Sequence, residues 1–74
     1  MKKVAFKDFA EKLREISKLG FITKFEAMSD GWFMLRITKN DRSVTRECHA
    51  DDANFENIIE AVDVMVEDWK ERFS

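Results

Sequence analysis

The stretch AMSDGWFMLR, residues 27–36, decides how the strands of this chain pair. Asp30-Gly31 is a turn signal, and a strand with one solvent-exposed face should follow it with alternating apolar and polar residues. Instead four apolar residues stand in a row, from Trp32 to Leu35. The number of residues in the turn therefore determines which of the four point into the core.

The apolar pattern of the preceding strand favours a three-residue loop, Ser29-Asp30-Gly31. A two-residue loop would place Phe33 and Leu35 on the same face as Lys24 and Glu26, whereas the longer loop gives them apolar partners. We therefore expect Gly31 to be the left-handed residue that closes a type I turn with a bulge. The predicted core face of the sheet then consists of Phe25, Ala27, Phe33, Leu35, Ile37, Val44 and Cys48.

Helical spacing of apolar residues predicts a helix at each end of the chain, over residues 5–18 and 53–73. Gly20 is the expected left-handed cap of the first helix. The expected N-cap of the second is Asp51, Asp52 or Asn54.

Between the helices the sequence predicts three strands, over 21–28, 32–39 and 43–49, with a loop around Asn40-Asp41 joining the last two. This order predicts one α+β domain over residues 1–74, α-β-β-β-α. In it, a three-stranded antiparallel meander carries both helices on one face and leaves the other face uncovered.

Composition narrows the class of protein. The chain has 74 residues, 38% of them charged and 45% apolar, which is typical of a folded domain too small for both a core and a deep catalytic cleft. No apolar run approaches the roughly 20 residues that span a bilayer, and no signal peptide is recognisable. The single cysteine suits a reducing compartment, so we expect a cytoplasmic protein without a membrane association.

The uncovered sheet face carries the first candidate site. In the predicted register Met28, Trp32 and His49 form one cross-strand row, and Met34 lies in the next row. Trp32 and Met34 are either ordinary cross-strand packing or a contact patch for a partner protein or a second copy of the chain. Base stacking by Trp32 is a further alternative, with few basic residues near it.

The second candidate site is an acidic row on the last helix. Residues 1–50 carry eleven basic and seven acidic side chains, whereas residues 51–74 carry two basic and eight acidic ones. Five of the latter fall on one arc that runs about 22 Å along the helix axis: Glu56, Glu60, Asp63, Glu67 and Glu71.

We expect this acidic row to be solvent-facing and unpaired. The basic flank of the first helix, Lys7, Arg14 and Lys18, lies on the same rotational side of its own helix as the acidic arc. In two parallel helices on one sheet face, such flanks cannot face each other. The row is then either a solvated face, a surface for a basic partner groove or, least favoured, a cation site, because its carboxylates do not converge.

The residues give no basis for catalysis, a cofactor or a metal. Cys48 and His49 point to opposite faces of a strand, so they can neither chelate one ion nor form a nucleophile–base pair. Cys48 is expected to be a core thiol and His49 a surface side chain. With two glycines in the chain there is no phosphate loop. We therefore predict that the protein is not an enzyme.

Over residues 5–73 the order and length of the elements resemble the double-stranded RNA-binding domain, which is also α-β-β-β-α. The segment that starts the last helix, Asp51-Asp52-Ala53-Asn54-Phe55, stands where that family has phosphate-binding lysines. The tight Ser29-Asp30-Gly31 stands where the family has its minor-groove loop. The resemblance implies the fold, and no RNA-binding residue carries over.

In size, acidic arrangement and element order the chain is also similar to small phage-encoded inhibitors, including some anti-CRISPR proteins. This resemblance implies a non-enzymatic module that inhibits a nucleic-acid-handling protein by presenting phosphate-like charge. The alternatives are nucleic-acid binding through the basic half, Lys2, Lys3, Lys7, Arg14 and Lys18, and a homodimer formed through the exposed sheet face.

Overall fold

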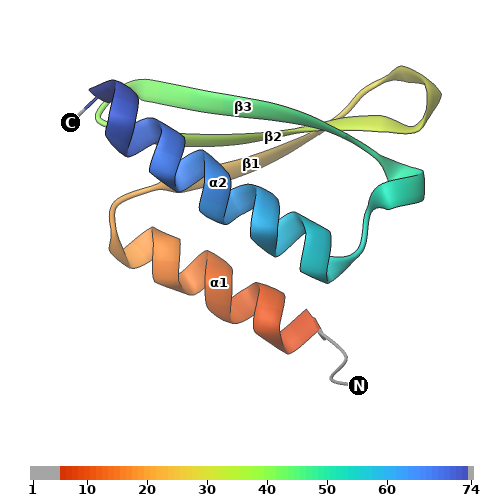
Figure 1. Cartoon of the computed structure of the whole chain (residues 1–74), viewed down its shortest axis with the longest axis horizontal. Helices are drawn as coiled ribbons and strands as arrows, with labels where there is room; N and C mark the ends of the chain where they lie inside the picture. Colours follow the sequence, from red (N-terminus) through yellow and green to blue (C-terminus); the bar gives the residue numbers. More distant parts are fainter. Residues whose placement is uncertain (1–5, 74) are drawn as a thin grey trace.

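The computed structural model describes residues 6–73 (Figure 1). In chain order the helices and strands are α1 (Phe6–Lys18), β1 (Ile22–Ala27), β2 (Trp32–Lys39), β3 (Arg42–His49) and α2 (Phe55–Phe73). This order confirms the predicted α-β-β-β-α fold of the α+β class. The expected first residue of the first helix, residue 5, lies outside the described residues, as do Lys2 and Lys3.

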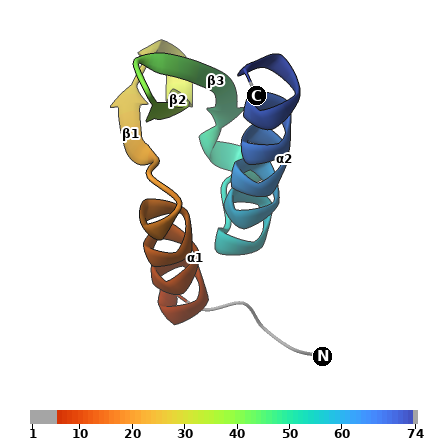
Figure 2. The ribbon, with the colours of Figure 1, turned by 90° about the vertical axis from the view of Figure 1, so that its left-hand side faces the viewer.

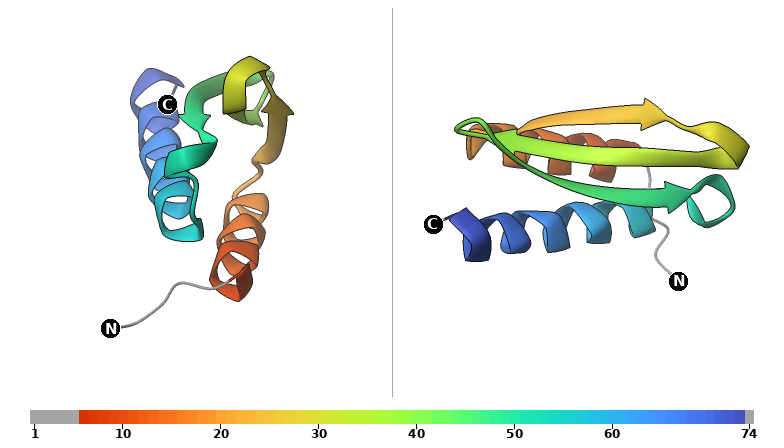
Figure 3. Two further views of the ribbon diagram at one scale, coloured as in Figure 1. Left: turned by 90° about the vertical axis from the view of Figure 1, so that its right-hand side faces the viewer. Right: turned by 90° about the horizontal axis from the view of Figure 1, so that it is seen from above.

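The three strands form one antiparallel sheet in the order β1-β2-β3, and both helices lie on the same side of it (Figures 2 and 3). The helices run parallel to each other, as expected, with α2 beside β3 and α1 beneath β1 (Figures 1 and 2). No described element covers the opposite face of the sheet. Neither α1 nor α2 combines the length and the hydrophobicity that a bilayer-crossing helix requires.

The register between β1 and β2 is the one that the three-residue loop predicts. Phe25 pairs with Leu35, and Ala27 pairs with Phe33. Gly31 has the expected positive φ, 80°. The expected type I turn is wrong, however, because Asp30 also has left-handed backbone angles, φ 60° and ψ 34°. Aspartate tolerates this conformation better than most residues do, so the loop takes two consecutive left-handed residues.

The second hairpin turns on Asn40 and Asp41, whose φ angles are 54° and 63°. Two left-handed residues between paired Lys39 and Arg42 make a type I′ turn, the form that matches the twist of the strands. The expected pairing of Ile37 with Val44 and of Phe33 with Cys48 is confirmed.

Gly20 ends α1 with a positive φ, 98°, as expected. The Gly20 N–H donates to the Ser17 carbonyl, and the Phe21 N–H donates to the Ile16 carbonyl, at 3.0 and 3.1 Å. These two bonds are those of the Schellman motif, and the buried side chains of Ile16 and Phe21 supply its apolar contact. The cap thereby directs the chain from α1 into the core and then into β1.

The core lies between α2 and the two strands nearest to it. Leu35, Ile37 and Val44 are buried as predicted, and Phe33 and Cys48 are partly buried against them. From α2 the core receives Ala61, Val62, Met65, Val66 and Trp69.

The prediction that the helices cover Phe25 and Ala27 is wrong. Phe25 is 47% exposed although its ring contacts that of Phe9 on α1, and Ala27 is also exposed. β1 is the strand farthest from α2, and α1 lies beneath β1 (Figure 2). The sequence pattern assigns a residue to a sheet face, whereas the helix positions decide how much of that face is covered.

The structure selects Asn54 among the three predicted caps of α2. Its Oδ1 accepts a hydrogen bond of 2.8 Å from the Asn57 N–H, as an N-cap does. The helix begins at Phe55 rather than at residue 53, because Ala50–Asp52 forms a short 3₁₀ turn. Asp52 contributes its backbone carbonyl, which accepts from the Asn57 side chain at 2.7 Å.

Replacing the cap tests this assignment. We expect Asn54→Ala to lower the free energy of unfolding by about 1 kcal/mol, because the Asn57 N–H loses its acceptor. Asp52→Ala is the matched control and keeps the carbonyl that Asn57 uses, so its effect should be clearly smaller. Urea unfolding followed by circular dichroism measures both values. A larger loss in Asp52→Ala would contradict the assignment.

Candidate functional site

The structure brings together the four residues of the predicted sheet-face patch. Trp32 and His49 are cross-strand partners, and their rings meet edge to face with centroids 5.0 Å apart. The Met28 N–H donates to the Trp32 carbonyl at 2.8 Å, which places Met28 beside Trp32 at the end of the sheet. Met34 lies between Glu26 and Glu47, as predicted.

The uncovered face leaves large apolar side chains in contact with water. Trp32 is 43% exposed and Met28 45% exposed, while Met34 is half-buried. Ile22, on the same face of β1, is 62% exposed and was not among the predicted site residues. The alternation that places Met28 outward also places Ile22 outward, so the sequence carried this signal. Glu26 and Arg36 form an ion pair of 3.7 Å between the two apolar ends.

His49 holds the two loops at this end of the sheet together. Its Nδ1 accepts a hydrogen bond of 3.1 Å from the Asp51 N–H, and its Nε2 lies 3.0 Å from the Asp30 carbonyl. A neutral imidazole with its proton on Nε2 satisfies both contacts, because the carbonyl can only accept. A Cβ on Gly31 would lie 3.2 Å from Nε2, so glycine leaves the room that the ring needs. His49 therefore positions Trp32 and the loop of residues 29–31.

The expectation that the acidic row is unpaired is wrong at its centre. The Lys12 ammonium lies 2.9 Å from an Asp63 carboxylate oxygen and 3.3 Å from one of Glu15. The hydrogen bond to Asp63 is the main cause that raises the pKa of Lys12 above its ordinary value of 10.5. Lys12 is on the side of α1 that faces α2, not on the flank of Lys7, Arg14 and Lys18, so it reaches Asp63 although that flank does not.

The rest of the row is only partly neutralised. Glu67 lies 3.6 Å from the Lys70 ammonium within α2. Among the described residues, Glu56, Glu60 and Glu71 are exposed and have no ion pair. The uncompensated charge of the row therefore lies at its two ends, with Glu56 and Glu60 at one and Glu71 at the other.

The basic surface of α1 is interrupted by acids. Lys7, Arg14 and Lys18 are exposed, as expected. Arg14 and Lys18 border a shallow hollow together with Glu11 and Glu15. Alternating charges of this kind do not make the continuous positive surface that phosphate backbones attract.

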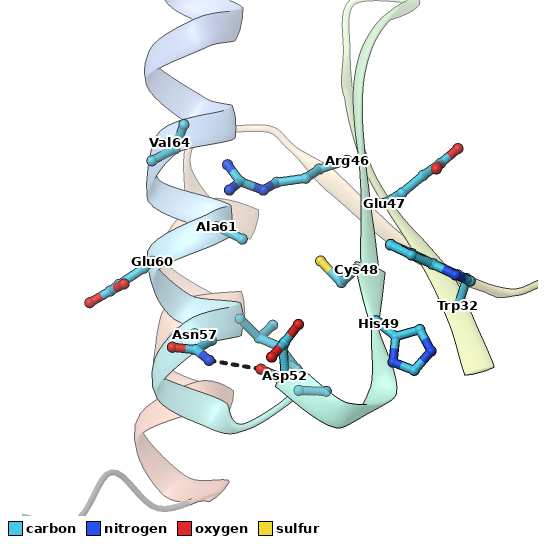
Figure 4. Close-up of a pocket in the computed structure, with 12 residues that line it drawn as sticks. Trp32, Arg46, Glu47, Cys48, His49, Asp52, Asn57, Glu60, Ala61 and Val64 are labelled. Carbon is cyan, nitrogen blue, oxygen red and sulfur yellow. Dashed lines mark hydrogen bonds between the residues drawn. The ribbon is translucent and has the colours of Figure 1, made fainter. Parts of the chain in front are cut away.

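A hollow of about 380 Å³ opens between the end of β3 and the start of α2 (Figure 4). Arg46 reaches into it from the helix side of β3, where it pairs with Leu35 on β2, and no other described side chain neutralises it. Cys48 points toward α2 and His49 away from it, which confirms the prediction that the two side chains point to opposite faces of the strand. Strand alternation places Arg46 on the helix-facing side of β3, between Val44 and Cys48, although Arg46 was not among the predicted core residues.

Within residues 6–73, no group of three His, Cys, Asp or Glu side chains is close enough to hold a metal ion. Comparison with known protein families, curated proteins and solved structures found no match for this chain. The function must therefore be argued from the surfaces themselves.

The link between the helices can be tested through Lys12. Lys12→Met keeps the aliphatic stem, which is only 18% exposed, and removes the ammonium. Because the folded-state pKa of Lys12 is raised, its contribution to stability is present below about pH 10.5 and is lost as the pH rises through the folded-state pKa.

We expect Lys12→Met to lower the free energy of unfolding at pH 7 by up to about 1 kcal/mol, since Asp63 is half exposed. The difference from the parent protein should shrink as the pH rises above 10.5 and through the raised folded-state pKa of Lys12. Urea unfolding at pH 7 and over this higher range measures it, with Lys18→Met as the control for an exposed lysine of the same helix. An equal loss in both variants, or one that does not change with pH, would contradict the role of the pair.

Proposed function

We propose that this chain is a non-enzymatic protein-binding module whose contact surface is the uncovered sheet face around Trp32. One observation carries the proposal: Ile22, Met28 and Trp32 are exposed on a face that no described element covers. Scattered exposed apolar residues are ordinary, but here they lie on one rigid sheet.

The chemistry of this face is that of a binding surface. Tryptophan and methionine are enriched in the cores of interfaces, and tryptophan buries a large area at a low cost in conformational entropy. Trp32 is held by its edge-to-face contact with His49, and His49 is itself fixed by both loops. A preorganised ring of this kind loses little conformational entropy on binding. The ion pair of Glu26 and Arg36 lies between Ile22 and the Met28–Trp32 end of this face, so a partner would meet polar as well as apolar groups.

The exposed acids of α2 support a second candidate, a surface for a basic groove of a nucleic-acid-handling protein. Glu56, Glu60 and Glu71 have no ion pair among the described residues, although the chain contains thirteen lysines and arginines. The five carboxylates stand on average about 5–6 Å apart along the axis, against about 3.4 Å between phosphates of one strand. Because Asp63 and Glu67 are paired with Lys12 and Lys70, phosphate imitation would rely on Glu56, Glu60 and Glu71.

The sheet-face proposal predicts a loss of partner binding in Trp32→Ala. The immobilised protein would be incubated with lysate of its native host, and each captured protein quantified by mass spectrometry. We expect the partner's apparent affinity to fall at least about tenfold, the effect of removing a central interface aromatic. Val64→Ala, which removes an exposed apolar group from α2, is the matched control. If Trp32→Ala and Val64→Ala capture the partner protein equally well, the proposal is contradicted.

The acidic-row candidate predicts a different variant and a salt effect. We expect Glu60→Lys to weaken binding to a basic partner about tenfold or more, and binding of the parent protein to fall steeply as salt is raised from about 0.1 M toward 1 M. Glu11→Lys makes the same charge change on α1 and is the control. An affinity that changes neither with the salt concentration nor in Glu60→Lys would contradict this candidate function.

A further inference from the structure

β1 is an open edge of the sheet. It pairs with β2 on one side, and no described element lies along its other side (Figures 2 and 3). Five of its six residues are exposed, including Ile22 and Phe25. Unpaired strand edges are templates for another strand, and proteins ordinarily shorten, charge or cover them.

The hydrogen-bonding phase of this edge follows from the end of the hairpin. Because the Met28 N–H donates to the Trp32 carbonyl, the backbone groups of Met28 point toward β2. In an antiparallel ladder this direction alternates along the strand. The N–H and C=O groups of Thr23, Phe25 and Ala27 therefore point outward, away from β2.

The opposite edge of the sheet, β3, is partly occupied. The Trp69 indole N–H donates to the Arg42 carbonyl at 2.9 Å, and α2 packs beside the strand. The Arg42 carbonyl itself faces β2, because Arg42 pairs with Lys39 across the two-residue turn, so the obstacle along β3 is the helix that packs beside it. The two edges thus differ, and β1 is the one free to accept a strand along its length.

We propose that two copies of this chain associate through β1, antiparallel and two-fold symmetric, with Phe25 of one copy opposite Phe25 of the other. The outward phase allows only registers in which Thr23, Phe25 and Ala27 pair among themselves. Of the three central registers, one sets Lys24 against Lys24 and another sets Glu26 against Glu26. Only the register centred on Phe25 sets Lys24 of each copy against Glu26 of the other.

This register also matches the apolar residues of the edge. On the outer face, Ile22 of one copy lies opposite Met28 of the other, so two exposed side chains of each copy gain a partner. On the helix face the two Phe25 rings meet, next to the ring of Phe9 in each copy. Cross-strand pairs of aromatic or opposite charge each stabilise a sheet by about 0.2–1 kcal/mol. Lys24 and Glu26 of β1 thus favour pairing with a second copy of β1 over pairing with a strand that lacks complementary charges.

The association is closed, because the two-fold axis uses both free β1 edges and leaves none. It joins the two sheets into one of six strands and keeps both Trp32 faces uncovered. The edge dimer is therefore compatible with the proposed partner surface and does not depend on it.

Sedimentation equilibrium tests the proposal, with protein from about 10 µM to about 1 mM, a range that detects weak self-association. We expect the mass of the parent protein to rise toward twice its 8.8 kDa. Lys24→Glu sets Glu26 of each copy against a like charge twice per dimer, and should raise the dissociation constant about tenfold or more. The charge swap Lys24→Glu with Glu26→Lys should restore the association.

Two further measurements keep the result independent of misfolding. Thr23→Pro removes an outward N–H without breaking the β1–β2 ladder, so it should stay folded by circular dichroism and lose the association. In hydrogen exchange, the Phe25 amide of the parent protein should become protected as concentration rises.

Three results would overturn the edge dimer. A parent protein that remains monomeric up to about 1 mM shows that the edge does not associate. If Lys24→Glu leaves the association unchanged, or if Lys24→Glu with Glu26→Lys does not restore it, the register centred on Phe25 is wrong. Association lost in Trp32→Ala but kept in Lys24→Glu assigns the contact to the sheet face instead.

Discussion

The left-handed backbone at Gly31 lets the chain pass from β1 to β2 in three residues, and every side chain of β2 takes its face from that count. Phe33 and Leu35 point to the helices, and Trp32 and Met34 point to the uncovered face. A loop one residue shorter would exchange the two sets. His49 reinforces the loop by bonding to the Asp30 carbonyl, at the place where a side chain on residue 31 would collide with it.

The distribution of packing follows from where α2 lies. The fully buried side chains, Leu35, Ile37, Val62 and Met65, belong to α2 and the central strand. At the far end of the sheet, the Lys39 ammonium lies over the rings of Phe21 and Trp69. α1 and β1 lie at the margin of this core, to which α1 contributes Ile16 and Leu13 and the α1 cap contributes Phe21. The Lys12–Asp63 ion pair also links α1 to α2. A domain of this size cannot cover both sheet faces and both edges. The surfaces that it leaves open are the ones proposed here for binding.

What could be read from the sequence depended on periodicity and on turn chemistry. Strand register, the Gly20 cap and the opposite orientations of Cys48 and His49 all follow from rules that act over a few residues. The same alternation placed the Trp32 patch correctly. These features are local, and the structure has them as predicted.

Two of the failures concern relations between elements. Coverage of Phe25 depends on how far α1 lies from α2 across the sheet, and no short-range pattern encodes that separation. The Lys12–Asp63 pair depends on which flank of α1 faces α2, and only packing settles it. The second left-handed residue, Asp30, is a local difference within the first hairpin loop. Which surface meets a partner is a relation to another molecule, so it remains a proposal.

The register of β1 and β2 is the claim on which both binding surfaces rest, and nuclear Overhauser effects between Hα protons measure it most directly. In antiparallel sheets these protons are closest at the non-hydrogen-bonded pairs. The account predicts strong contacts between Ala27 and Phe33 and between Phe25 and Leu35. Contacts between Met28 and Phe33 and between Glu26 and Leu35 would contradict it, because the core and the Trp32 face would then have exchanged places.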